Sequence, residues 1–222
     1  MQAACKALRN TIVNTAIADP RSPLQGLKAE DIEIDDGWLQ SNANKSRREE
    51  VVALAARQAS PLLERGQAKP GDERSRYAFH SFGAVFAEVT VDRDLGVVRV
   101  PRIVAAYDVG RLLNAKTALS QLRGGIVWGV SMALHEHTVL DTRVGRFVNA
   151  NLADYHVPVN ADIQVLDVRF VGAPDPYVNP LGVRGIGEIG ITGVAAAIAN
   201  AVYHATGKRI RALPITVDAL VA

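Results

Sequence analysis

Segment 182–193 constrains the fold of this chain more than any other stretch. It reads Gly-Val-Arg-Gly-Ile-Gly-Glu-Ile-Gly-Ile-Thr-Gly and holds five glycines in twelve residues. Glycine tolerates positive φ and lets two backbones, or a backbone and a ligand, approach each other closely. The apolar run 194–203 that follows is typical of a buried helix. This order predicts a tight turn that leads into a core helix, with one carboxylate, Glu188, inside the turn.

The same segment contains the pattern G-x-G-x-x-G at Gly185, Gly187 and Gly190. That pattern indicates a dinucleotide site only between a strand and a helix, with an acidic residue about 20 positions later. The preceding residues 177–181 are too short and contain a proline, which disfavours a central strand. Asp218 lies well beyond the required spacing. A free-standing nicotinamide nucleotide-binding protein is therefore the weakest interpretation.

Composition excludes several classes of protein. The 222 residues are 48% hydrophobic, enough for one large or two small cored domains, and the formal charge of +2 gives no footprint for nucleic acid. A single cysteine rules out a Cys-ligated iron–sulfur cluster within the chain. No apolar run is long enough to cross a membrane. The polar segment 61–76, with its Pro-Gly pair, is the candidate internal boundary or mobile loop.

Alternation of apolar residues predicts the strands. Residues 82–91 and 97–107 flank a polar turn, so we expect them to pair as an antiparallel hairpin. Asp36-Gly37 is typical of the tight turn of a second, shorter hairpin. One further strand is expected over 163–171.

Helices are expected over 2–18, 114–134 and 194–205. Glycines interrupt the second of these and cost about 1 kcal/mol each relative to alanine, which indicates close packing against backbone or ligand. The S-x-x-E pattern from Ser46 to Glu49 predicts a capping box that opens another helix. Strands and helices mix without a regular βαβ rhythm, so the predicted fold class is α+β.

Several segments, in this order, carry a family resemblance. They are 82–89, 121–129, the Tyr-x-x-Pro element at 155–158, the glycine-rich segment 182–193 and the tail 207–214. Together they closely resemble the C-terminal part of the molybdenum-binding large subunit of the xanthine dehydrogenase/aldehyde oxidase family, and most of all its bacterial aldehyde-oxidising members. The resemblance runs over nearly the whole of residues 1–222. It implies the mixed strands and helices of that family's molybdopterin-binding domain.

The resemblance implies a catalytic role for Glu188, which matches the family's catalytic glutamate, a general base. Burial among apolar groups strengthens a carboxylate as a base, and we expect Ile186 and Ile189 to provide it. The alternative is structural, because a glutamate near a helix start is favourable through the helix dipole alone.

Cofactor contacts are implied at further positions. Gln121 matches a glutamine that hydrogen-bonds the pterin, and an amide suits that task because it donates and accepts at one edge. An ordinary solvated helix glutamine is the alternative. Gly124 and Gly125 in the helix, and Gly185 and Gly187 in the turn, would let backbone approach the cofactor closely; tight helix packing is the alternative for the first pair.

Arg184 stands where family members often have a lysine that lines the substrate entrance. It keeps the charge but is planar and bulkier, so a substrate contact is its candidate role. No metal ligand is expected in the chain. His135-Glu136-His137 is the only cluster that suggests one, and adjacent residues do not share a face on a helix or strand.

The resemblance also implies cofactors, partners and limits. We expect the molybdenum cofactor, in its molybdopterin cytosine dinucleotide form, with iron–sulfur clusters and FAD on partner subunits. Complete large subunits are several times longer and carry earlier cofactor loops absent here. The chain is therefore expected to be a segment that needs the N-terminal part of the subunit, is inactive alone and exposes apolar surface.

The implied reaction is oxidation of aldehydes to carboxylic acids. Hydroxylation of xanthine or another N-heterocycle, and a non-catalytic remnant of the fold, are the alternatives. The expected location is the cytoplasm, or the periplasm if a partner carries an export signal.

Overall fold

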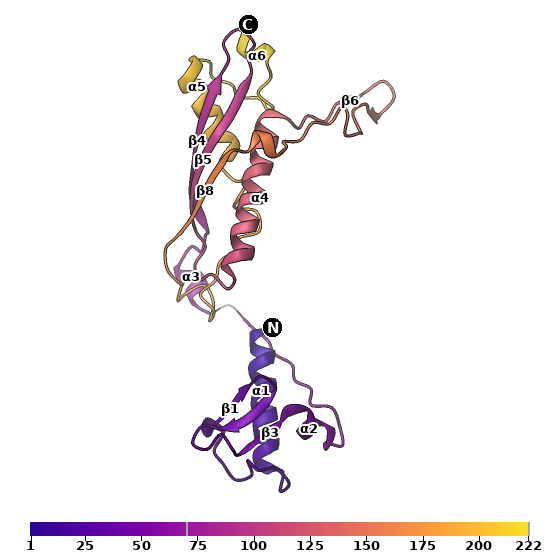
Figure 1. Ribbon diagram of the computed structural model, residues 1–222, viewed down its shortest axis with the longest axis vertical. Coiled ribbons are helices and arrows are strands. Elements are labelled where there is room, and N and C mark those ends of the chain that lie inside the picture. Colours follow the sequence, from indigo (N-terminus) through magenta and orange to yellow (C-terminus); the bar gives the residue numbers. More distant parts are fainter. Residues whose placement is uncertain (70, 222) are drawn as a thin grey trace. The chain divides into compact units, whose positions relative to one another are not determined.

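The computed structural model describes residues 1–69 and 71–221, and the chain divides into two compact units, Met1–Pro70 and Gly71–Ala222 (Figure 1). The division falls inside the polar segment 61–76. Each unit has its own cluster of buried apolar side chains. Among the described residues, no helix combines the length and apolar character that a membrane crossing needs.

The first unit packs helices against a three-stranded antiparallel sheet of order β1-β2-β3. Its elements are α1 (Gln2–Ala18), η1 (Ala29–Asp31), β1 (Ile32–Asp35), β2 (Trp38–Ser41), β3 (Arg48–Glu50) and α2 (Val51–Ala56). The predicted short hairpin is confirmed, because β1 pairs with β2 around Asp36 and Gly37, whose φ angles are 42° and 80°. The predicted first helix is confirmed at 2–18.

The predicted capping box at Ser46–Glu49 is wrong. Arg48 and Glu49 belong to strand β3, which pairs with β2, and α2 begins only at Val51 without a side-chain cap. The physical reason is that the Glu49 side chain is buried and pairs with Arg57 at 2.5 Å. A carboxylate held in this way does not reach back to cap a helix.

The second unit is built on a three-stranded sheet of order β4-β5-β8. Its elements are α3 (Glu73–Arg76), β4 (Phe82–Val91), β5 (Val98–Asp108), α4 (Ala115–Leu134), β6 (Leu140–Asp141), β7 (Arg146–Phe147), η2 (Asn160–Asp162), β8 (Val165–Val171), α5 (Val194–Thr206) and α6 (Asp218–Val221). The predicted long hairpin is confirmed by the antiparallel pairing of β4 with β5. The helix α4 and the strand β8 also lie where they were predicted. With helices and a mixed sheet, the α+β class is confirmed.

The pairing of β5 with β8 is parallel, which the sequence pattern did not indicate. Parallel neighbours need a crossover connection, and α4 followed by a projecting arm supplies it (Figure 1). The arm carries the small β6–β7 hairpin and exposes large apolar side chains, among them Leu152, which is 87% exposed. On β4, Phe86 is 68% exposed. Large apolar side chains are thus exposed on both the arm and the sheet.

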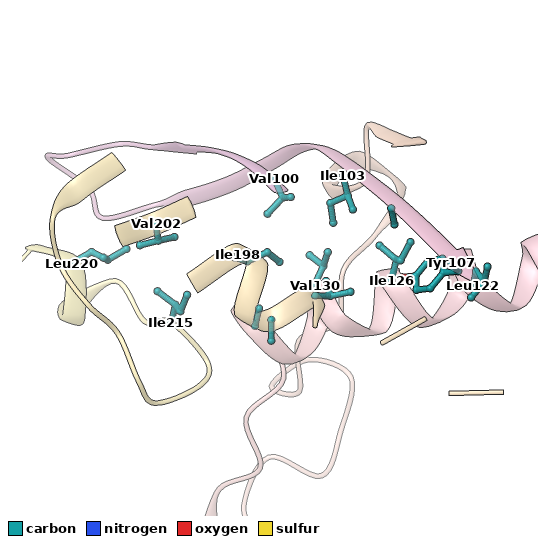
Figure 2. Close-up of a cluster of buried hydrophobic side chains, with 14 of the residues drawn as sticks. Val100, Ile103, Tyr107, Leu122, Ile126, Val130, Ile198, Val202, Ile215 and Leu220 are labelled. Carbon is teal, nitrogen blue, oxygen red and sulfur yellow. The ribbon is translucent and has the colours of Figure 1, made fainter. Parts of the chain in front are cut away.

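The core of the second unit lies between the sheet and the helices α4 and α5 (Figure 2). Strand β5 contributes inward-facing side chains that include Ile103 and Tyr107. Helix α4 contributes Leu122, Ile126 and Val130 at intervals of four, which places them on one helix face. This packing fixes α4 along the sheet and leaves its other face free.

Candidate functional site

The site lies at the carboxyl ends of the two parallel strands. Asp108 at the end of β5 is in register with Val171 at the end of β8. The segment leaving β5 leads into α4, and the segment leaving β8 contains the glycine-rich stretch 182–193, here called the glycine loop. In open sheets that contain parallel strands, loops at this end commonly form ligand sites.

Two adjoining cavities lie between α4 and the glycine loop, with volumes of about 280 Å³ and 480 Å³. Thr117, Gln121 and Gly187 line both of them. The smaller cavity is also lined by Glu188, so the expectation that Gln121 and Glu188 share one cleft is confirmed. We call the two cavities together the cleft. The larger cavity adds an apolar wall and two arginines, Arg111 and Arg184.

Gln121 ties the helix to the loop. Its Nε2 donates to the Gly187 carbonyl oxygen at 2.5 Å. Among the described residues, its Oε1 accepts no hydrogen bond. One acceptor and one N–H of the amide are therefore available to a ligand in the cleft.

The glycines of the site fall into two kinds. Gly125 and Gly190 pack backbone on backbone, because a Cβ on Gly125 would lie 2.8 Å from Gly190 Cα. Gly124, Gly185 and Gly187 are different, since a Cβ on any of them would meet nothing within 4 Å. Tight packing thus explains the first pair, whereas the other three border open space.

Glu188 is exposed, and the expectation that Ile186 and Ile189 bury it is wrong. Both isoleucines turn inward and pack against the core of the second unit. Glu188, which lines the smaller cavity, therefore has no apolar cover from these two neighbours. Glu188 also lies ahead of α5, whose N-cap is Gly193 at φ 87°, so it is no part of the first helical turn.

Tyr107 supports the far end of the glycine loop from inside the core. Its hydroxyl donates to the Gly190 carbonyl oxygen at 3.2 Å. Burial raises the pKa of the Tyr107 phenol, so it stays a neutral donor. The strand β5 thereby holds the loop against α4.

Arg184 is largely enclosed, with a side chain that is 12% exposed. Its guanidinium donates hydrogen bonds to the Asp108 carboxylate at the end of β5 and to the His80 carbonyl oxygen. Its Nε lies 3.8 Å from Asp175 Oδ2. Burial raises the pKa of Asp108, but hydrogen bonds from Arg184 and from the Gly110 N–H outweigh it and hold that pKa below its ordinary value. Arg184 does border the larger cavity, yet its contacts are those of a structural ion pair.

Sequence reasoning missed Thr117, Ser120 and Trp128, which also line the smaller cavity. Together with Gln121 and Gly124 they occupy one face of α4 at helical spacing. That spacing was the signal available in the sequence, and the structure adds that Trp128 is 57% exposed. No group of His, Cys, Asp or Glu placed to hold a metal ion occurs in the described part of the chain.

Comparison with known proteins gives consistent results. The profile of the molybdopterin cofactor-binding domain family matches residues 1–164. The aldehyde oxidoreductase molybdenum-binding subunit PaoC of Escherichia coli K12 is 39% identical over 218 residues, which cover 98% of this chain and 28% of PaoC. The xanthine dehydrogenase molybdenum-binding subunit of Escherichia coli O157:H7 is 40% identical over 136 residues, covering 61% of this chain and 18% of that subunit. The chain thus spans little more than a quarter of PaoC.

Solved structures share the fold. Quinoline 2-oxidoreductase from Pseudomonas putida 86 superposes with a TM-score of 0.75 at 23% identity, over 98% of this chain and 28% of its own. The aldehyde oxidoreductase from Desulfovibrio gigas gives 0.57 at 33% identity, over 64% of this chain and 15% of its own. The family profile ends before the glycine loop, whereas the match to PaoC includes it. The chain therefore belongs to the molybdopterin cofactor-binding domain family, within the molybdenum-binding large subunits of the xanthine dehydrogenase/aldehyde oxidase type.

Proposed function

We propose that this chain forms part of the active site of a molybdenum hydroxylase that oxidises aldehydes to carboxylic acids. The molybdenum cofactor is held in the cleft between α4 and the glycine loop, and Glu188 is the general base. One observation carries the proposal: Gln121 and Glu188, far apart in sequence, line the same cavity.

The residues of the cleft fit such a cofactor. Gly124 lies inside a helix, where glycine costs about 1 kcal/mol relative to alanine, and no described neighbour needs the space it leaves. Gly187 leaves similar room on the loop side, whereas Gly185 borders open space but is not among the residues that line the two cavities. The free edge of the Gln121 amide faces a ligand that both donates and accepts. A flat, polar group bound against α4 would fill the space beside the glycines and hydrogen-bond the Gln121 amide.

Glu188 is placed to move a proton. When bound, the cofactor supplies the redox chemistry, accepting the two electrons that leave the aldehyde carbon as that carbon gains an oxygen derived from water. The oxygen loses a proton as it attacks, and the Glu188 carboxylate, exposed in the cleft, accepts it. Because its own neighbours leave Glu188 uncovered, bound cofactor, substrate and further protein would exclude water from it.

The similarity to PaoC, an aldehyde oxidoreductase subunit, over 98% of this chain supports aldehydes as substrates. It also supports a multi-subunit enzyme, in which the rest of the large subunit completes the cofactor site and partner subunits carry iron–sulfur clusters and FAD. We assign the cofactor the cytosine dinucleotide form. Hydroxylation of xanthine or another N-heterocycle is the second candidate, favoured by 40% identity to a xanthine dehydrogenase subunit over a shorter stretch.

Copurification from the native host, followed by molybdenum and iron analysis, tests the assembly. We expect molybdenum in the complex that contains this chain, and Gln121→Ala to lower molybdenum per chain by roughly three- to tenfold, the effect of one lost hydrogen bond. Gln58→Ala is the matched control, because Gln58 also donates its amide to a backbone carbonyl, that of Leu54. A complex without molybdenum, or equal losses in both variants, would contradict the cofactor site and favour a non-catalytic module.

A further inference from the structure

We infer that Arg184 is a positioning residue that clamps the glycine loop onto the end of β5 and so determines where Glu188 stands. The role of Glu188 as a base rests on the proposed function. The clamp itself rests only on the contacts of the chain.

The guanidinium of Arg184 joins three separate segments. It donates to the His80 carbonyl at 2.7 Å and to the Asp108 carboxylate, and its Nε lies 3.8 Å from Asp175 Oδ2. Gly172, at φ 87°, leaves the space that the Asp108 carboxylate fills. The planar fork of an arginine suits several acceptors in different directions.

Backbone bonds continue the same attachment. The Arg184 N–H donates to the Val109 carbonyl at 2.9 Å, and the Arg111 N–H donates to the Gly182 carbonyl at 2.7 Å. The start of the glycine loop is therefore paired with the chain that leaves β5. Both the side chain and the backbone of Arg184 take part in this junction.

Two contacts hold the residues between the clamp and the base, the packing of Ile186 on the core and the Ser81 hydrogen bond to the Gly185 carbonyl at 2.7 Å. Gly185, Ile186 and Gly187 separate Arg184 from Glu188, and the two glycines have no side chain to anchor. Glycine also has the largest backbone freedom to lose. The carboxylate position thus depends on fixed points on either side, which are Arg184 and the Gln121 bond to Gly187 before it and the Tyr107 bond to Gly190 after it.

These contacts argue against Arg184 as a substrate contact. Turning the guanidinium to a ligand would leave Asp108 and Asp175, with side chains 15% and 16% exposed, without their counter-charge. A lysine would be a weaker replacement, because an ammonium is a point charge without the planar fork that donates to both the His80 carbonyl and Asp108.

Hydrogen exchange on the full chain, read by mass spectrometry, tests the clamp. In Arg184→Gln we expect the amides that join the loop to the end of β5, those of residues 184 and 111, to exchange at least about tenfold faster, with β4 and β5 unchanged, because a buried ion pair is broken locally. Arg184→Lys should restore part of the protection. Arg169→Gln is the matched control, because Arg169 pairs with Asp167 in the same sheet but is 69% exposed.

Unchanged exchange in the glycine loop of Arg184→Gln would overturn the clamp, and so would equal acceleration in the loop and in the strands. If Arg184→Gln does not fold, Asp108→Asn, which removes the charge of the partner, carries the same criterion. Hydrogen exchange is measured without a cofactor, so the test of the clamp remains valid even if the cleft does not bind molybdenum. In the assembled enzyme, the clamp predicts a lower kcat at constant molybdenum content, whereas a substrate contact predicts a raised KM.

Discussion

Both units contain an arginine held between two carboxylates, and the surroundings of the two arginines differ. In the first unit, Arg57 pairs with Asp19 at 3.0 Å and with Glu49 at 2.5 Å, joining the end of α1 to strand β3. In the second unit, Arg184 joins the end of β5 to a loop rich in glycine. The same arrangement of ion pairs stabilises the scaffold of the first unit and attaches the glycine loop in the second unit. Damage to the first unit should therefore appear as lost stability, and damage to the glycine loop as lost activity.

Two glutamates test that contrast with the largest expected effect. Glu188→Gln in the assembled enzyme should lower turnover per molybdenum by about 10²–10⁴-fold, the usual loss when a general base is removed. Its Tm should not change, because the side chain is exposed. Glu49→Gln should do the opposite, lowering Tm because it removes a buried partner of Arg57. Full turnover in Glu188→Gln would show that Glu188 is not the base.

The independence of the units is tested in their cores. Leu39→Ala in the first unit should destabilise that unit by about 2–5 kcal/mol, because Leu39 is fully buried. Native-state hydrogen exchange should show faster exchange in 1–69 and unchanged exchange in β4, β5 and α4. Leu122→Ala, equally buried, is the reciprocal variant. Equal acceleration in both units would mean that the chain unfolds as a single cooperative unit.

Adjacent glycines of α4 sharpen the comparison within the second unit. Gly124→Ala should stabilise the chain by up to about 1 kcal/mol, because its Cβ meets open space in a helix. It should also lower molybdenum content, since the methyl group enters the cleft. Gly125→Ala should destabilise the chain, because its Cβ would lie 2.8 Å from the Gly190 backbone. The Tm and the molybdenum content of both variants are the measurements. Equal changes in both variants would contradict the distinction between glycines that pack against backbone and glycines that border open space.

The smallest expected effect is on acid stability. The backbone N–H of Arg21, followed by side-chain bonds from Arg21 and Arg57, lowers the pKa of Asp19 from 3.8 to about 2 despite burial. A folded pKa below the unfolded one means that Asp19 stabilises the first unit fully above pH 3.8 and loses this effect as the pH falls toward 2. Asp19→Asn should flatten that part of the stability curve, measured by tryptophan fluorescence in a Trp128→Phe background that leaves Trp38 as the reporter. An unchanged acid slope would contradict the assignment.

Local pattern was enough to predict most elements. The hairpin of β4 and β5 and the helices α4 and α5 follow from alternation and helical period, because each has one face against the core. The capping-box prediction failed because a distant partner, Arg57, takes the Glu49 carboxylate. Sequence spacing does not encode that competition.

The sequence predicted several residues that line the cleft, but not the arrangement of the strands and loops that form it. Family resemblance placed Gln121 and Glu188 together, but the parallel pairing of β5 and β8 that brings their segments to one edge depends on contacts across the whole crossover. The substrate role of Arg184 came from its match to a lysine of the family, and its partner Asp108, 76 positions away, is not apparent from the sequence. The inward turn of Ile186 and Ile189 likewise depends on a core that no local pattern reveals.

The backbone contact between Gly125 and Gly190 has a consequence for access to the cleft. Two backbones in contact leave no side chain that can swing aside, and the Tyr107 hydroxyl holds the same Gly190 from the core. This half of the glycine loop is a fixed wall and cannot act as a lid. Access to Glu188 is therefore governed by segments other than this half of the glycine loop.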